Sequence, residues 1–174
     1  MGLGGWLVPE GYMLGTWGSP TSIRNRIVDL IGEDSTITFY EKFEKNYVTE
    51  KDIIQLSKWG FNSVRLPFHY KTLSPQFGSY DEKGFSVIDS VIAWCSRSEI
   101  YLILDMHVAP GSQSGDENAD GDAGAQLWDS SSNQDWAVDI WGEIARRYST
   151  ERWIGGYDLL NEPVLYNGGS QVRN

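Results

Sequence analysis

The chain has 174 residues, of which 22% are charged, 40% hydrophobic and 13% aromatic. This length allows a buried core and is too short for two large domains. Acidic residues outnumber basic ones by 24 to 14, and the formal net charge of −10 repels nucleic acid and anionic membrane surfaces. No apolar run approaches the roughly 18 residues of a membrane span, and no intact signal peptide follows Met1. We therefore expect neither nucleic acid nor a membrane as a partner.

Short apolar segments alternate along the chain with segments of helical period. Strands are expected at Leu3–Val8, Phe61–Leu66, Ile100–Met106 and Tyr157–Leu160, the first being the weakest. Helices are expected between them, from Thr49 to Gly60, around 87–95 and over about 133–148. The single cysteine, Cys95, lies on the apolar stripe of the second helix and is expected in the core. The repeated order of strand, helix and strand predicts a parallel sheet with right-handed crossovers.

Long loops are expected after the strands, at about 67–83 and 108–132. In parallel α/β folds the functional residues lie where the strands end, so these loops are the place to search. An extra stretch at 22–47 carries a helical apolar pattern and is expected to cap one end of the sheet.

The strand ends carry polar residues of the types that active sites use. Arg65 lies near the end of the second strand and His69 follows it, His107 follows the third, and Asn161 and Glu162 follow the fourth. Each alone could be a structural ion pair or hydrogen-bonding group, but polar groups beside buried strands are costly unless they are paired or used. We expect them to converge on one rim, although His69 could equally be a structural hydrogen-bonding residue.

These residues resemble glycoside hydrolase family 5, the cellulase family. The resemblance rests on Gly4–Glu10, Gly60–Pro67, Leu104–His107, Ala109–Gln113 and Ile154–Pro163, and the first and fourth of these are similar to the branch containing exo-β-1,3-glucanases. It implies a retaining hydrolase of β-linked glucan or a related polysaccharide, without a cofactor. It also implies an α/β fold of the (β/α)8 TIM-barrel type, in which residues 1–174 form the N-terminal half with about four of the eight βα units.

The resemblance further implies a role for each site residue. Glu162 would be the general acid/base, Asn161 would bond the sugar 2-hydroxyl, Arg65 would hold the nucleophilic carboxylate ionised, and His107 would bond a sugar hydroxyl. Glu10 resembles a sugar-binding acid of the exo-glucanase branch. Trp128, in a loop near the rim, is expected to form a wall of a sugar subsite.

A retaining glycosidase needs a second carboxylate about 5 Å from the first. In the family this nucleophile follows the seventh strand, and Asp105 and Asp158 are expected too far below the rim to replace it. We therefore expect the 174-residue chain alone to be inactive. Its open sheet edges are expected to pair with a missing C-terminal half-barrel or with a second copy.

Two other interpretations stay open: a carbohydrate-binding fragment without catalysis, and a self-associating half-barrel. The segment Asp116–Asp122 imitates the start of a calcium loop, but Leu127 occupies the position of the bidentate glutamate, which favours a solvated acidic loop and no metal. An extracellular or periplasmic location is expected because polymeric glycans are generally met outside the cell.

Overall fold

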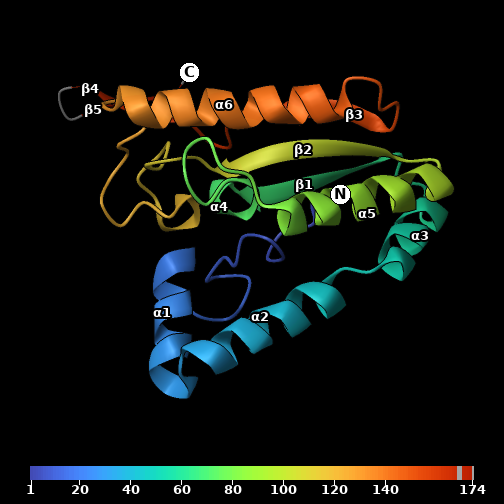
Figure 1. Ribbon diagram of the computed structural model, residues 1–174, viewed down its shortest axis with the longest axis horizontal. Coiled ribbons are helices and arrows are strands. Elements are labelled where there is room, and N and C mark those ends of the chain that lie inside the picture. Colours follow the sequence, from blue (N-terminus) through green and yellow to red (C-terminus); the bar gives the residue numbers. More distant parts are fainter. Residues whose placement is uncertain (168–169, 174) are drawn as a thin grey trace.

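A computed structural model of the protein describes residues 1–167 and 170–173 (Figure 1). Its elements in chain order are α1 (Pro20–Ile31), α2 (Glu33–Tyr47), α3 (Glu50–Lys58), β1 (Ser63–His69), α4 (Tyr70–Leu73), α5 (Glu82–Ser98), β2 (Tyr101–Val108), a 3-10 turn η1 (Glu117–Ala119), α6 (Ser131–Tyr148), β3 (Ile154–Asp158), β4 (Val164–Asn167) and β5 (Ser170–Arg173). Among the described residues, no helix is both long and apolar enough to cross a membrane.

The central sheet is parallel, as the alternation of strands and helices predicts. Its strand order is β1-β2-β3, with Val64 opposite Leu102 and Leu104 opposite Tyr157. Helices α5 and α6 connect consecutive strands and run alongside them in Figure 1. The carboxyl ends of the three strands therefore lie at one edge of the sheet.

The expected first strand at Leu3–Val8 is wrong as a continuous element. It forms only two isolated parallel bridges with β1, from Gly2 to Arg65 and from Leu7 to Phe68. Gly5 lies between them with a φ of 73°, a left-handed conformation that interrupts an extended chain. The fourth expected strand is displaced, because β3 begins at Ile154 and ends at Asp158.

The expected helices form, and local capping explains where they begin. Thr49 and Asp52 make a reciprocal capping box at the start of α3. The stretch 22–47 forms two helices, α1 and α2, separated at Gly32, whose φ is 79°. They lie below the sheet in Figure 1, and the Trp6 indole donates to the Glu44 carbonyl at 2.8 Å. The pair thus covers the N-terminal segment rather than capping the sheet itself.

The two faces of the sheet differ in polarity, and this difference positions the site. One face packs against the helices through fully buried side chains, which are Val64, Leu66, Phe68, Leu102, Leu104 and Met106. Cys95 of α5 lies in the same core, as its position in the apolar stripe predicts. Alternation along the strands places Arg65, Asp105, His107 and Asp158 on the opposite face.

A short antiparallel hairpin, β4–β5, follows the parallel sheet, with Val164 opposite Arg173. The sequence interpretation did not anticipate it. The two glycines that follow Asn167 in the sequence were the available signal, because a glycine pair favours tight hairpin turns.

Candidate active site

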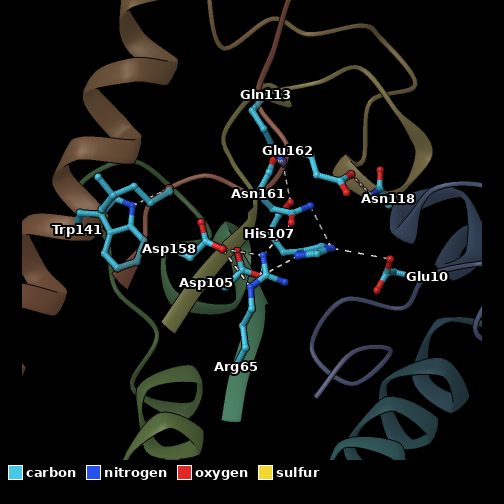
Figure 2. Close-up of polar contacts among 11 residues, drawn as sticks. Glu10, Arg65, Asp105, His107, Gln113, Asn118, Trp141, Asp158, Asn161 and Glu162 are labelled. Atoms are coloured by element: carbon cyan, nitrogen blue, oxygen red, sulfur yellow. Dashed lines mark hydrogen bonds and ion pairs between the residues drawn. The ribbon is translucent and has the colours of Figure 1, made fainter. Parts of the chain in front are cut away.

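A pocket of about 320 Å³ opens beside the strand ends. Its polar lining includes Glu10, Arg65, His107, Asn118, Asn161 and Glu162. Five of these six residues are predicted site residues, and they come from four separate segments of the sequence. The structure therefore brings these five residues together at one rim, and Figure 2 shows how their side chains face one another.

Arg65 is the centre of the polar cluster. Its Nε and Nη2 donate to Asp158 Oδ2 at 3.0 and 2.8 Å, and Nη2 also donates to Asn161 Oδ1 at 2.8 Å. The same Nη2 lies 3.0 Å from Asp105 Oδ2. Residues from the other two parallel strands, together with Asn161, therefore hold the guanidinium in one orientation (Figure 2).

His107 lies between two carboxylates. Its Nδ1 is 2.7 Å from Asp105 Oδ2 and its Nε2 is 3.8 Å from Glu10 Oε2. Burial alone would lower the pKa of His107, but the two carboxylates raise it to about 9. Burial opposes ionisation of Glu10 too, yet the His107 contact lowers the pKa of that carboxyl below its ordinary value. At neutral pH the pocket thus presents an imidazolium beside a carboxylate.

Asn161 and Glu162 leave the end of β3 in a backbone conformation that tertiary contacts hold. Asn161 N donates to the Met106 carbonyl at 3.2 Å, and Val164 N donates to the Gln113 carbonyl at 3.0 Å. Between them Glu162 has a φ of 44°, which costs a non-glycine residue roughly 1–2 kcal/mol. Glu162 is exposed, and its Oε2 accepts a hydrogen bond from Asn118 at 3.3 Å. The strained backbone directs the carboxylate into the pocket.

Gln113 holds this arrangement in place through its side-chain amide. Its side-chain amide donates to the carbonyls of His107 and Asn161, both at 2.8 Å, and accepts from Ala109 N at 3.0 Å. The side chain is fully buried, so these bonds satisfy a polar group that would otherwise be costly. Gln113 thus ties the end of β2 to the segment that carries Glu162.

Two predicted site residues do not line this pocket. His69 is buried, accepts from Lys71 N at its Nδ1 and faces Asp120 Oδ2 with its Nε2 at 3.2 Å. Because Nδ1 accepts, Nε2 carries the proton, and burial lowers the imidazole pKa. These contacts favour the structural alternative for His69. Trp128 donates from its indole to the Gln113 carbonyl at 2.8 Å and packs on the core, so it supports Gln113 rather than walling the pocket.

The acidic segment after β2 is not the solvated loop that the sequence suggests. Asp120 accepts from Thr21 N and Thr21 Oγ1 at 2.9 and 2.6 Å, Asp122 accepts from Ser19 Oγ at 2.7 Å, and Glu117 accepts from Gly18 N at 2.9 Å. The segment therefore holds the N-terminus of α1. No group of three or more His, Cys, Asp or Glu residues suited to a metal occurs within the described part of the chain.

Asp105, Asp158, Gln113 and Asn118 are site residues that sequence reasoning missed. Asp105 and Asp158 were weighed only as nucleophiles, although each lies at a strand position on the same face as Arg65. Two-residue spacing from His107 was the available signal for Asp105. Asn118 had no such signal, because it reaches Glu162 across 44 residues of sequence.

A parallel α/β sheet with a carboxyl, an amide, an imidazole and a guanidinium gathered at its strand ends has the arrangement seen in proteins of the (β/α) barrel class. Comparison with known proteins gives the family. The family model for cellulase, glycosyl hydrolase family 5, matches residues 28–174. The chain belongs to glycoside hydrolase family 5, and its barrel-type fold follows.

Among the curated relatives, a β-xylosidase from Phanerodontia chrysosporium is 35% identical over 94% of this chain and 35% of its own length. Endoglucanase C from Acetivibrio thermocellus is 38% identical over 74% of this chain and 38% of its own. A glucan 1,3-beta-glucosidase from Blumeria graminis is 28% identical over 98% and 42%. The chain therefore spans about two fifths of the length of these relatives.

Solved structures share the fold. A rutinosidase from Aspergillus niger superposes with a TM-score of 0.74 at 17% identity, covering 97% of this chain and 49% of that one. A structure described as a glycoside hydrolase gives a TM-score of 0.56 at 30% identity, over 69% of this chain and 36% of the other. The matched portions place the parallel sheet within a barrel architecture, which confirms the expected fold class.

Proposed function

We propose that the pocket binds a sugar residue of a β-linked glycan, and that Glu162 acts as the general acid/base of a retaining glycosidase. The observation that carries this proposal is the gathering of Glu162, Asn161, His107, Arg65 and Glu10 around one opening. A pocket of about 320 Å³ suits a small ligand or one unit of a longer one. Named relatives that act on xylosides and glucans agree with a β-linked substrate.

Each polar group has a chemical task in this reaction. A carboxyl group such as Glu162 can protonate the leaving oxygen and later deprotonate water. Asn161 has its amide oxygen occupied by Arg65, which leaves the amide nitrogen to face His107 and the pocket. Arg65 supplies a fixed positive charge beside the reacting centre, and this charge would hold a nucleophilic carboxylate in its ionised form. We propose an extracellular or periplasmic site of action, where polymeric glycans occur.

The second carboxylate is proposed to lie outside these 174 residues. Glu10 is the other carboxylate among the residues lining the described pocket, and it is engaged with His107. Asp105 and Asp158 are occupied by Arg65. We therefore expect no hydrolysis by the 174-residue chain alone, since a retaining reaction needs a nucleophile about 5 Å from the acid/base.

The test of the acid/base role uses the full product of the gene, with a polysaccharide and a 2,4-dinitrophenyl β-glycoside as substrates. Glu162→Gln is expected to lower polysaccharide hydrolysis by about 10²–10⁴-fold. The dinitrophenyl glycoside, whose leaving group needs no protonation, should lose much less in the step that releases dinitrophenol. Glu41→Gln, an exposed glutamate of α2, is the matched control.

Equal losses on both substrates would contradict the acid role of Glu162. The 174-residue chain is assayed in parallel. Hydrolysis that survives purification and disappears in Glu162→Gln would overturn the proposal of an external nucleophile, and loss in Glu10→Gln as well would assign that role to Glu10.

A further inference from the structure

Asp105 is a fully buried carboxylate on the central strand of the sheet. It does not line the pocket, and it lies on the strand face shared with Arg65 and Asp158. Burying a charged group at such a position costs several kcal/mol unless partners compensate it. The partners of Asp105 therefore show what the residue is retained to do.

Only one of its two oxygens has partners. Oδ2 lies 2.7 Å from His107 Nδ1 and 3.0 Å from Arg65 Nη2, so a single atom joins two pocket side chains. Oδ1 is buried without a hydrogen-bond partner among the described residues. Arg65 is also held by Asp158, whereas Asp105 is the partner of His107 at Nδ1.

This contact decides which nitrogen of His107 faces the pocket groups. Nδ1–H donates to Asp105, which turns Nε2 toward Asn161 Nδ2 at 3.4 Å and Glu10 Oε2 at 3.8 Å. The Asn161 amide cannot reverse without losing the bond from Arg65 to its Oδ1. Neutral His107 thus accepts from Asn161 at Nε2, whereas protonated His107 directs its second N–H to Glu10.

We propose that Asp105 is a positioning residue of the active site, whose Oδ2 fixes the Arg65 guanidinium and the His107 imidazole in the orientation that they present to substrate. That these two side chains face a substrate rests on the proposed function, in which the pocket binds a sugar residue. Asp105 touches no substrate in this proposal and acts through the other two side chains.

The first test needs no substitution, because the chain has only two histidines. Long-range 1H–15N correlation spectra of the imidazoles distinguish the neutral tautomers. His69, which accepts from Lys71 N at Nδ1, should show the Nε2–H form. His107, above its pKa of about 9, should show the Nδ1–H form because that proton is donated to Asp105. A predominantly Nε2–H form of His107 would overturn the proposal.

The second test removes the charge and keeps the shape. In Asp105→Asn the amide oxygen can still accept from Arg65 and His107, so the Nδ1–H tautomer should persist while the His107 pKa falls by about 1 unit or more. The matched control is Asp89→Asn on α5, which removes a carboxylate that accepts a hydrogen bond from Tyr148 of α6 and should leave the His107 pKa unchanged. An unchanged pKa in folded Asp105→Asn would reject the role.

The outcomes separate this inference from the proposed function. Both measurements read the state of an imidazole and require no substrate. If they succeed while the full gene product neither binds nor hydrolyses β-glycans, the positioning role stands and the function fails. If hydrolysis depends on Glu162 but neutral His107 carries its proton on Nε2, the proposed function stands and the positioning role of Asp105 fails.

Discussion

At the scale of single residues, the two histidines show how their surroundings set the protonation of identical groups. Both are nearly buried, with 8% of His69 and 6% of His107 exposed. His69 receives a backbone N–H at Nδ1 and meets one carboxylate, whereas His107 lies between two carboxylates. Burial therefore lowers the pKa of His69, while Asp105 and Glu10 overcome burial and raise that of His107 to about 9.

The raised pKa of His107 predicts a pH dependence of stability. Because the pKa is about 9 in the folded chain against 6.5 for the free group, His107 stabilises the fold fully below pH 6.5. That contribution is lost as the pH rises through 9. Urea unfolding between pH 6 and 10 should show the free energy of unfolding falling in the native chain and staying flatter in His107→Gln. His69→Gln is the control that should keep the fall. Equal slopes in the native chain and His107→Gln would contradict the assignment.

At the scale of elements, the N-terminus of α1 is held by a segment far away in sequence. Asp120 accepts two hydrogen bonds from Thr21 across 99 residues and contacts His69 at the start of α4. Although burial opposes ionisation, these contacts hold the pKa of Asp120 well below its ordinary value. The 3-10 turn η1, which carries Asn118, lies directly before Asp120. The contact of Asn118 with Glu162 therefore depends on a turn anchored at α1.

Removing this anchor should loosen α1 first. Asp120→Ala leaves Thr21 N and His69 without their acceptor, and a lost capping acceptor costs about 0.5–2 kcal/mol. Hydrogen–deuterium exchange should accelerate over 19–31, and the free energy of unfolding should fall. Asp116→Ala, at an exposed carboxylate of the same loop, is the matched control. Unchanged exchange at α1 in Asp120→Ala would show that the hydrogen bonds do not stabilise the helix.

At the scale of the whole molecule, the two outer strands of the parallel sheet are covered unequally. The N-terminal segment runs along β1 through two bridges, whereas β3 pairs with β2 alone among the described strands. Unpaired strand edges present free N–H and C=O groups to other chains. We propose that further strands of a complete (β/α)8 barrel pair with this edge, and that in the 174-residue chain the edge of β3 mediates self-association.

Sedimentation velocity over a range of concentrations measures this association. The 174-residue chain should form dimers or larger species whose proportion rises with concentration. Tyr157→Lys places a charge on the edge strand and should shift the chain toward monomer. Tyr101→Lys is the matched control, because this exposed tyrosine begins the central strand, which is already paired on both sides. A monomer at all concentrations would reject self-association.

The sequence by itself determined the parallel α/β arrangement and most of the polar residues that line the pocket. Apolar periodicity, capping residues such as Thr49 and the helix stop at Gly60 are local properties, so they can be recognised without the fold. Strand ends in a parallel sheet meet at one edge, which is why Arg65, His107, Asn161 and Glu162 could be grouped in advance. The weak strand at Leu3–Val8 failed because Gly5 bends it.

Only the tertiary structure decided which groups contact one another. His69 lies outside the pocket and faces Asp120, which is 51 residues away in the sequence, and Arg65 contacts Asp158 across 93 residues. No local sequence pattern predicts contacts between residues so far apart in the chain. These contacts depend on how the helices pack and on the register in which the strands pair. The roles of Asp105 and of the acidic segment can therefore be recognised only in the folded structure. A hydrogen bond depends on atomic positions to within a few tenths of an ångström, and tertiary packing sets these positions.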